Sequence, residues 1–223
     1  MVQKSPRDAV EAAPRRRGRP RAFEAETALA QAMDVFWKEG FAGASLDDLS
    51  EATGLNRPSL YGAFGDKERL FLEAVEFYAS GPGGFGQRAL EEEPTAHAAV
   101  ERLLVEAAAE LTRSCHPAGC LMVMATTNCS VAAGHIHAAL AKRRALGVAS
   151  MQARIQRGID EGELPPETDA ASLANFYATI YQGMSMQAKD GATRDSLLAT
   201  ADAAMRAWPG VKNPVHDAAK AAA

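Results

Sequence analysis

Apolar side chains recur at steps of three and four residues along almost the whole chain, with Gly and Pro standing between the periodic segments. Residues 24–39 show the pattern first, with their apolar side chains on one stripe of an amphipathic helix. No segment shows the sustained alternation that is typical of a β-strand. The sequence therefore predicts an all-α fold, and its 223 residues suffice for one large or two small domains.

Four helices are predicted in the first eighty residues, and the residues that begin and end them are recognisable. The first covers 24–39 and is stopped by Gly40. Ser45 begins the second with the pattern of a capping box, and Gly54 ends it. Asn56 caps the third, whose inner face we assign to Leu60, Ala63 and Phe64. The fourth follows Asp66 and continues to about Tyr78.

The rest of the chain is predicted to hold five further helices. Residues 80–86 read SGPGGFG, which indicates a flexible break. The predicted helices beyond it cover 95–114, 120–131, 136–159, 170–189 and 194–208. Residues 160–169 form a clear boundary between the third and fourth of these helices, and the low-complexity tail 209–223 is expected to fray.

Charge is distributed unevenly along the chain. Residues 1–23 hold seven basic and two acidic side chains, a net charge of +5, whereas the whole chain carries −4. A basic arm on an acidic body indicates a polyanionic partner. Because the arm has no apolar periodicity, we expect it to be disordered until it meets that partner.

Several classes of protein are excluded by composition. No apolar run approaches the roughly 18 residues of a membrane span, and no apolar stretch of a secretory signal follows the N-terminal arginines. An odd count of three Cys is expected of a chain in the reducing cytoplasm. The Cys and His residues between 115 and 137 fit no metal-binding spacing, and no nucleophile is marked by an orienting group. We expect no metal, no cofactor and no enzymatic activity.

The second and third predicted helices, joined by a tight glycine-containing turn, match a helix-turn-helix unit. The outward side of the third helix offers a cation, a phenol and a closely approachable backbone, which suit a major groove and its flanking phosphates. The N-termini of the second and fourth helices can each hold a phosphate. Candidate DNA-binding residues are Arg17, Arg19 and Arg21 in the arm, then Ser45, Asn56, Arg57, Pro58, Ser59, Tyr61, Gly62 and Lys67. The same residues also fit a plain helical subdomain.

One stretch carries a specific motif. An apolar helix, a Gly-aromatic pair and a Ser-started helix ending in EATG precede SLYGAFGDKERL, from Ser59 to Leu70. In this order the elements resemble the DNA-binding domain of the TetR (tetracycline-repressor) family over residues 23–75, and RGRPR is similar to the arm of many members. Gly62 departs from the family, in which His or Tyr is common, so we expect specificity to depend more on Arg57, Tyr61 and the arm.

The resemblance implies a ligand-responsive transcriptional repressor. Such a protein binds a palindromic double-stranded DNA operator, forms a homodimer through its last two helices and leaves the operator when a small effector binds. By this resemblance, residues 1–22 are the arm and 23–80 the DNA-binding domain, 81–208 bind the effector and dimerise, and 209–223 are a flexible tail.

Soft and aromatic side chains in the C-terminal half can line an apolar effector pocket, with polar groups among them as handles. The candidates are Cys120, Met124, Asn128, Phe176, Tyr177 and Tyr181. Their helical spacing fits a core or a dimer interface equally well.

Two other functions stay open. Cys120 follows Pro117 and Gly119 at a helix start, where the helix dipole favours a reactive thiolate. The same P-x-G-C element recurs in a TetR subgroup that includes members responding to electrophiles or oxidants, so a thiol-sensing repressor is one alternative. The other is a helical interaction module whose basic arm binds acidic lipid or protein.

Overall fold

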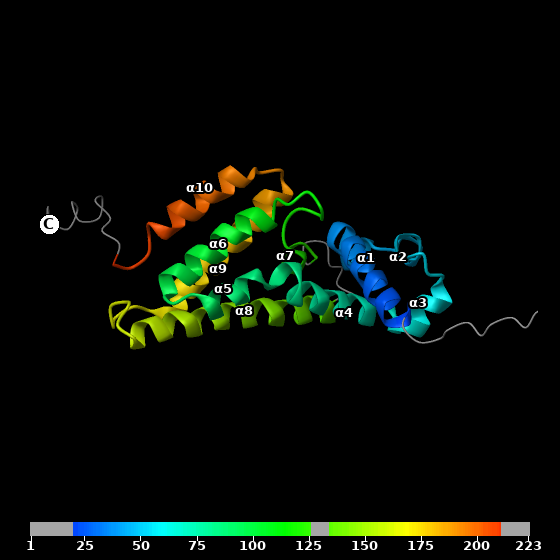
Figure 1. Cartoon of the computed structure of the whole chain (residues 1–223), viewed down its shortest axis with the longest axis horizontal. Helices are drawn as coiled ribbons and strands as arrows, with labels where there is room; N and C mark the ends of the chain where they lie inside the picture. Colours follow the sequence, from blue (N-terminus) through cyan, green and yellow to red (C-terminus); the bar gives the residue numbers. More distant parts are fainter. Residues whose placement is uncertain (1–19, 126–133, 211–223) are drawn as a thin grey trace, which may run out of the picture.

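The computed structural model describes residues 20–125 and 134–210, and every regular element in these ranges is helical. The predicted all-α fold is confirmed. The molecule is elongated, with α1–α3 at one end, α6, α9 and α10 towards the other, and α8 along most of its length (Figure 1). The elements are α1 Pro20–Gly43, α2 Leu46–Thr53, α3 Arg57–Phe64, α4 Lys67–Ser80, the 3₁₀ turn η1 Pro82–Gly84, α5 Phe85–Glu92, α6 Ala96–Glu110, α7 Leu121–Met124, α8 Gly134–Asp160, α9 Ala170–Lys189 and α10 Arg194–Met205.

Local capping chemistry fixes the ends of α2. The Ser45 hydroxyl accepts a hydrogen bond from the Asp48 amide at 3.1 Å, and the Asp48 carboxylate accepts one from the Ser45 amide at 2.8 Å. Gly54 ends α2 at φ 65°, in the left-handed region that favours glycine. The predicted capping box and glycine stop are both confirmed. The chain turns at Gly54, and α3 begins three residues later as a separate helix.

The helices α1, α3 and α4 follow the predicted pattern with two corrections. Gly40 breaks α1 at φ 72°, as predicted, but the helix begins at Pro20, so residues 20–22 of the expected arm are helical. Asn56 caps α3 by accepting from the Ser59 amide at 2.9 Å. Leu60 and Phe64 are buried in α3, whereas Ala63 is exposed, contrary to prediction. An eight-residue helix buries only a narrow face, and Ala63 lies outside it.

Aromatic side chains form the core of the DNA-binding end. The ring of Phe71 on α4 meets Phe36 edge-on at 5.0 Å between centroids, and it meets Phe41 at 5.2 Å. Phe36 and Phe71 are fully buried. Phe36 lies on α1 and Phe71 on α4, so these two long helices form the packed base against which the short helices α2 and α3 lie.

The segment predicted to be a flexible break is largely ordered helix. Residues 82–92 form η1 and α5, and α5 buries Phe85, Ala89 and Leu90 against α6. The density of glycine before Phe85 concealed the apolar spacing that follows it. Of the predicted helix over 120–131, α7 accounts for Leu121–Met124, and residues 126–133 lie outside the described part of the chain.

The helices α6, α8, α9 and α10 pack together in the C-terminal half, where α8 contacts α9 and α10 contacts both α6 and α9. Tyr177 of α9 is fully buried and donates its hydroxyl hydrogen to the Ala204 carbonyl of α10 at 3.2 Å. In the ranges described, no helix is long and apolar enough to cross a membrane.

Candidate DNA interface and effector cavity

The outward side of α3 carries the predicted contact residues. Arg57 and Tyr61 lie one turn apart on this side. The Arg57 side chain is 54% exposed and Tyr61 is 47% exposed. Pro58, Ser59 and Gly62 are exposed beside them. A Cβ atom built on Gly62 would meet nothing within 4 Å, so this surface stands clear of the rest of the protein. The recognition surface is therefore available to a ligand as large as a duplex.

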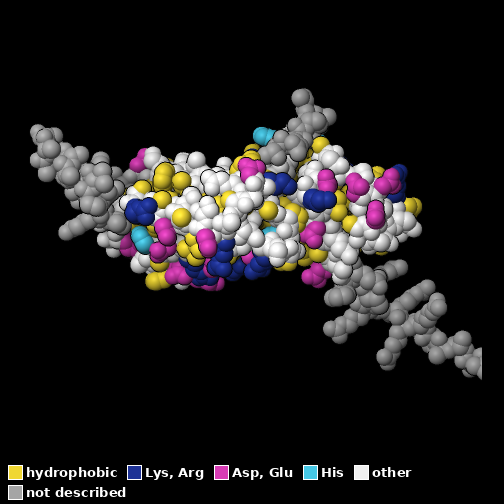
Figure 2. Space-filling view, turned by 90° about the horizontal axis from the view of Figure 1, so that it is seen from above, with side chains coloured by type: hydrophobic (Ala, Val, Ile, Leu, Met, Phe, Trp, Pro, Cys, Tyr) yellow, Lys and Arg dark blue, Asp and Glu magenta, His cyan; other side chains and the backbone are white. Residues whose placement is uncertain are grey.

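An acidic partner of Arg57 was not foreseen from the sequence. Asp47 of α2 accepts hydrogen bonds on Oδ1 from Arg57 Nη2 at 2.7 Å and Nε at 3.2 Å. This contact raises the pKa of the Arg57 guanidinium. At the α1–α3 end, acidic and basic side chains are interspersed on the face shown in Figure 2. The sequence signal for this pair is weak: it consists of an Asp in the exposed first turn of α2 and an Arg ten residues later.

The predicted phosphate contacts lie at helix N-termini. Lys67 begins α4, and its Nζ lies 4.7 Å from the centroid of the Phe41 ring. Partial burial lowers the pKa of the Lys67 ammonium, and the Asp48 carboxylate partly offsets this. Ser45 and Asn56 use their side-chain oxygens as caps, which leaves the Ser45 hydroxyl hydrogen and the Asn56 amide as donors. Arg17, Arg19 and the side chain of Arg21 lie outside what the structure describes.

A cavity of about 440 Å³ lies in the C-terminal half, between the end of α4, α5, α6 and the middle of α8. Its size is within the range of small-molecule sites. The wall is mostly apolar, and its residues are Tyr78, Ala79, Gly83, Gly84, Phe85, Gly86, Gln87, Leu90, Leu103, Cys120, Met122, Val123, Arg143, Arg144, Leu146, Gly147, Val148, Ser150, Met151, Ala178, Tyr181 and Gln182.

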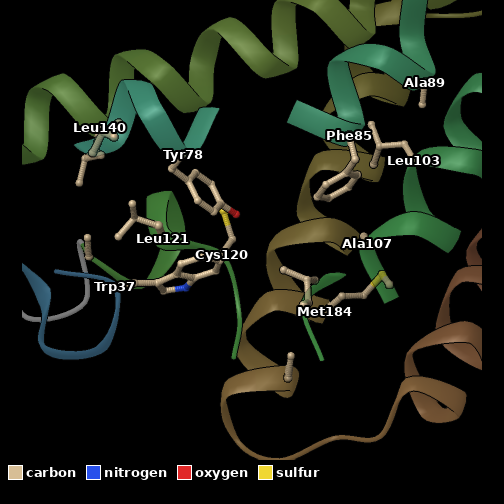
Figure 3. Close-up of a cluster of buried hydrophobic side chains, with 14 of the residues drawn as sticks. Trp37, Tyr78, Phe85, Ala89, Leu103, Ala107, Cys120, Leu121, Leu140 and Met184 are labelled. Atoms are coloured by element: carbon tan, nitrogen blue, oxygen red, sulfur yellow. The ribbon is translucent and has the colours of Figure 1, made fainter. Parts of the chain in front are cut away.

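Three polar groups meet on one side of the cavity. Tyr78 and Tyr181 each make a side-chain hydrogen bond with Cys120 and with one another, and the Leu121 amide also bonds to Tyr78. The Tyr78 hydroxyl points to the Cys120 sulfur, with Trp37 beneath and Phe85 across the space (Figure 3). Burial, followed by the nearby Cys120, raises the pKa of both tyrosines well above the ordinary value, so both remain neutral donors at pH 7.

Close packing keeps Tyr78 in this position. A Cβ atom on Gly83 would overlap the Tyr78 ring, so only glycine fits the turn that passes over it. The Tyr78 ring also meets Trp37 of α1 edge-on, with centroids 4.8 Å apart. Trp37 donates its indole N–H to the Gly119 carbonyl at 3.1 Å, just before Cys120. The DNA-binding end is thereby tied directly to the wall of the cavity.

Of the predicted effector residues that the structure describes, two line the cavity wall. Cys120, 3% exposed, and Tyr181 line it. Met124 is buried away from the wall, and Tyr177 lies in the core against α10, where burial raises its pKa to about 12. Phe176 is 41% exposed on α9 and packs edge-on against Tyr177. Asn128 lies outside the described residues.

The wall residues missed from the sequence come from two sources. Phe85 and Leu90 belong to α5, which the sequence did not predict. Arg143 and Arg144 lie on α8, where charged residues ordinarily face solvent. Arg143 pairs with Glu76 of α4. Eight residues earlier on each helix, His135 Nε2 lies 2.8 Å from Glu68 Oε2. The Arg143–Glu76 ion pair and the His135–Glu68 contact thus join α8 to α4.

The exposed α3, held by the turn from α2, defines a helix-turn-helix DNA-binding protein. Residues 28–74 match the family described as bacterial regulatory proteins, tetR family, and residues 83–208 match the tetracyclin repressor-like C-terminal domain. The chain belongs to the TetR family of transcriptional regulators.

Two curated relatives and a solved structure agree with this assignment. The chain is 34% identical to the HTH-type transcriptional repressor ComR of Escherichia coli (strain K12) over 203 residues, 91% of this chain and 97% of ComR. It is 28% identical to the repressor BdcR of the same strain, over 82% of this chain and 88% of BdcR. A cysteine mutant of the TetR family transcriptional regulator CifR, complexed with 26-bp operator DNA, is 41% identical with a TM-score of 0.80, over 89% of this chain and 100% of CifR. These relatives are regulators rather than enzymes.

Proposed function

We propose that this chain is a cytoplasmic transcriptional repressor that binds a palindromic DNA operator as a homodimer and leaves it when a small, largely apolar effector enters the cavity. The observation that carries the proposal is the position of α4. Its first residue, Lys67, lies beside the recognition helix, and Tyr78, near its last turn, lines the cavity. A ligand that displaces Tyr78 therefore acts on the helix that supports α3.

The DNA side of the proposal rests on the exposed surface of α3 and on the likeness to CifR, whose mutant was solved on a 26-bp operator. A dimer places two such helices in successive major grooves when they are about 34 Å apart. Arg17, Arg19 and Arg21 extend the contact as a basic arm. The operator contacts proposed for the body are those of Ser45, Asn56, Arg57, Pro58, Ser59, Tyr61, Gly62 and Lys67.

The dimer side is supported by the outer faces of the last two helices. Phe176 and Met186 of α9 are 41% and 40% exposed, which is unusual for such large apolar side chains. Ala199 and Ala203 of α10 are exposed and small enough to permit close approach of a second helix pair. A four-helix interface of two copies would cover these residues.

The effector side is supported by the cavity's link to the DNA-binding end. Trp37 of α1 touches Tyr78 and is hydrogen bonded to Gly119, so a ligand that moves either residue also strains α1. The effector shifts the population of dimers towards a spacing that no longer fits the operator. DNA affinity then falls by the difference in effector affinity between the two states.

The two alternative functions are not favoured. A thiol switch at Cys120 requires a reagent to reach a side chain that is 3% exposed and hydrogen bonded to two tyrosines. That arrangement suits Cys120 as a polar contact for a reversible ligand. The interaction-module alternative does not account for the helix-turn-helix geometry.

Selection of genomic fragments that bind the purified dimer tests the proposal. We expect enrichment of a palindromic site, bound at least about a thousandfold more tightly than random duplex at moderate salt. Compounds are then screened for release of a labelled operator. Equal affinity for enriched and random duplexes would contradict operator binding, and operator binding that no cavity ligand weakens would contradict effector control.

A further inference from the structure

The charged groups on the cavity wall are all of one sign. Within the described residues, Arg143 and Arg144 line the cavity, whereas no Asp or Glu does. The remaining polar wall residues are neutral and comprise Tyr, Gln, Ser and Cys side chains. The segment 126–133, between α7 and α8 in the sequence, reads TTNCSVAA and contains no charged residue. No carboxylate is therefore available there to offset the arginines.

The two arginines differ in how their charge is compensated. Arg143 pairs with Glu76 of α4. Arg144 donates from Nη1 to the Met122 carbonyl at 2.7 Å, which fixes the guanidinium but does not neutralise it. Among the described residues, no carboxylate lies within 4.0 Å of Arg144. A guanidinium has five N–H donors in a planar fork, so one anchored nitrogen leaves donors for a planar anion.

The rest of the wall accommodates an apolar body. Phe85 of α5, Leu103 of α6 and Met151 of α8 line the same cavity as Arg144. Figure 3 shows Phe85 and Leu103 on the side of the space opposite the Tyr78 hydroxyl. Buried apolar surface favours a hydrocarbon or aromatic body, while a charged group enters such a site only against an opposite charge.

We infer that the effector is a monoanion, a carboxylic acid with an apolar body, whose carboxylate binds Arg144 and whose body packs on Phe85, Leu103 and Met151. This inference rests on the proposed function, because it names the ligand of the same cavity. A cation is excluded because it would be brought beside Arg144 with no carboxylate on the described wall to balance it. A neutral amide of equal size keeps the apolar contacts and one acceptor oxygen, but it lacks the negative charge and the bidentate geometry of a carboxylate on a guanidinium.

The test uses the full-length protein and three probes with one apolar body: 4-phenylbutanoate, 4-phenylbutanamide and 4-phenylbutylamine. Binding is measured by calorimetry without DNA, so the result does not depend on operator binding. We expect the acid to bind at least about tenfold more tightly than the amide, with the amine weakest. A series from phenylacetate to 8-phenyloctanoate varies the length of the apolar body.

Variants assign the preference to Arg144. Arg144→Gln should abolish the preference for acid over amide, because the acid loses far more affinity than the amide does, and Arg144→Lys should restore part of that preference. Arg157→Gln is the matched control, since Arg157 lies on α8 outside the cavity and pairs with Glu161. A wild type that binds the amide or amine as tightly as the acid, or no acid of the series, would overturn the inference. So would an acid preference that survives Arg144→Gln. Operator release by the same acids tests the proposed function separately.

Discussion

The guanidinium of Arg57, at the first residue of α3, is held by the carboxylate of Asp47 on α2 through two hydrogen bonds to a single oxygen. An acidic side chain on the surface proposed to contact DNA would repel phosphates, so its presence there needs a compensating benefit. The benefit is orientation, since a fixed guanidinium presents its remaining donors in one geometry. Both side chains are largely exposed, so the pair contributes little to folding.

Asp47→Ala should make DNA binding tighter but less selective. The variant loses one negative charge, and Arg57 becomes free to contact phosphates. Affinity for random duplex should therefore rise roughly two- to fivefold, and the dependence of log affinity on log salt concentration should steepen by about one. Discrimination at the base pair read by Arg57 should weaken, as it should in Arg57→Ala. Fluorescence anisotropy at several salt concentrations measures both effects. An equal loss of affinity for operator and random duplex would show that Asp47 acts only on folding.

Lys67→Ala should weaken binding to every DNA sequence by a similar factor. Lys67 lies at the N-terminus of α4, where we expect its charge to add to the helix dipole in holding a phosphate. The salt slope should fall by about one. Tyr61→Phe should also weaken binding uniformly, with little change of slope because no charge is lost. Lys142→Ala on α8 is the control, and an effect of Lys67→Ala confined to one operator would mean that it reads a base.

Deleting residues 1–19 should leave folding and dimerisation unchanged but weaken operator binding. The deletion preserves α1 from Pro20 and removes six of the chain's basic side chains, including Arg17 and Arg19. Arg-rich segments of this kind enter narrow, A·T-rich minor grooves. The loss should therefore be larger for operators with A·T-rich flanks. Equal affinities of the deleted and full chains at moderate salt would reassign the arm to solubility alone.

Trp37→Phe should lower the free energy of unfolding by about 1–3 kcal/mol, because the buried Gly119 carbonyl loses its donor. The effector concentration needed for operator release should also change, since Trp37 joins α1 to Tyr78. Urea unfolding and an anisotropy titration measure the two effects. Trp208→Phe removes a buried indole remote from Tyr78 and should change stability without changing release.

Tyr177 should give the protein an alkaline instability that Tyr177→Phe removes. Its pKa is raised to about 12 in the folded chain, mainly by burial, against about 10 when unfolded. The unfolded chain therefore loses this proton first, and stability falls as pH rises from 10 to 12. Urea unfolding between pH 8 and 11.5 should show a shallower decline in the variant. If the stability of Tyr177→Phe fell with pH as steeply as that of the wild type, the alkaline instability would come from groups other than Tyr177.

The parts of the fold that sequence predicts well are those fixed by neighbouring residues. Ser45 and Asn56 accept from amides three residues ahead, and Gly54 adopts a left-handed backbone conformation, so the boundaries of α2 and α3 were predictable. Ala63 was placed wrongly because spacing alone does not show how much of a short helix another element covers. The break expected over residues 80–86 contains η1 and the start of α5, because Phe85 is buried and its ring meets Tyr181 of α9, far along the chain.

The candidate sites show the same division. The DNA contacts of Arg57, Tyr61 and Lys67 come from a local motif and stay predictions. The contact of Asp47 with Arg57 was not predicted, because it depends on how α2 and α3 cross. In the C-terminal half, Tyr181 lines the cavity and Tyr177, four residues earlier on the same helix, does not. Helical spacing places both on similar faces, and only the packing of α10 against Tyr177 separates them.

The cavity takes only Tyr78 and Ala79 from α4 and otherwise uses residues beyond it. Under the proposed function, substitutions on α5, α6 and α8 would alter which molecule is sensed while the residues proposed to contact DNA stay unchanged. For a designer of biosensors, effector specificity and operator specificity would then depend on different residues of this scaffold. For evolution, gene duplicates can acquire new chemical signals while they keep an old promoter, provided that the aromatic contact between Trp37 and Tyr78 is preserved.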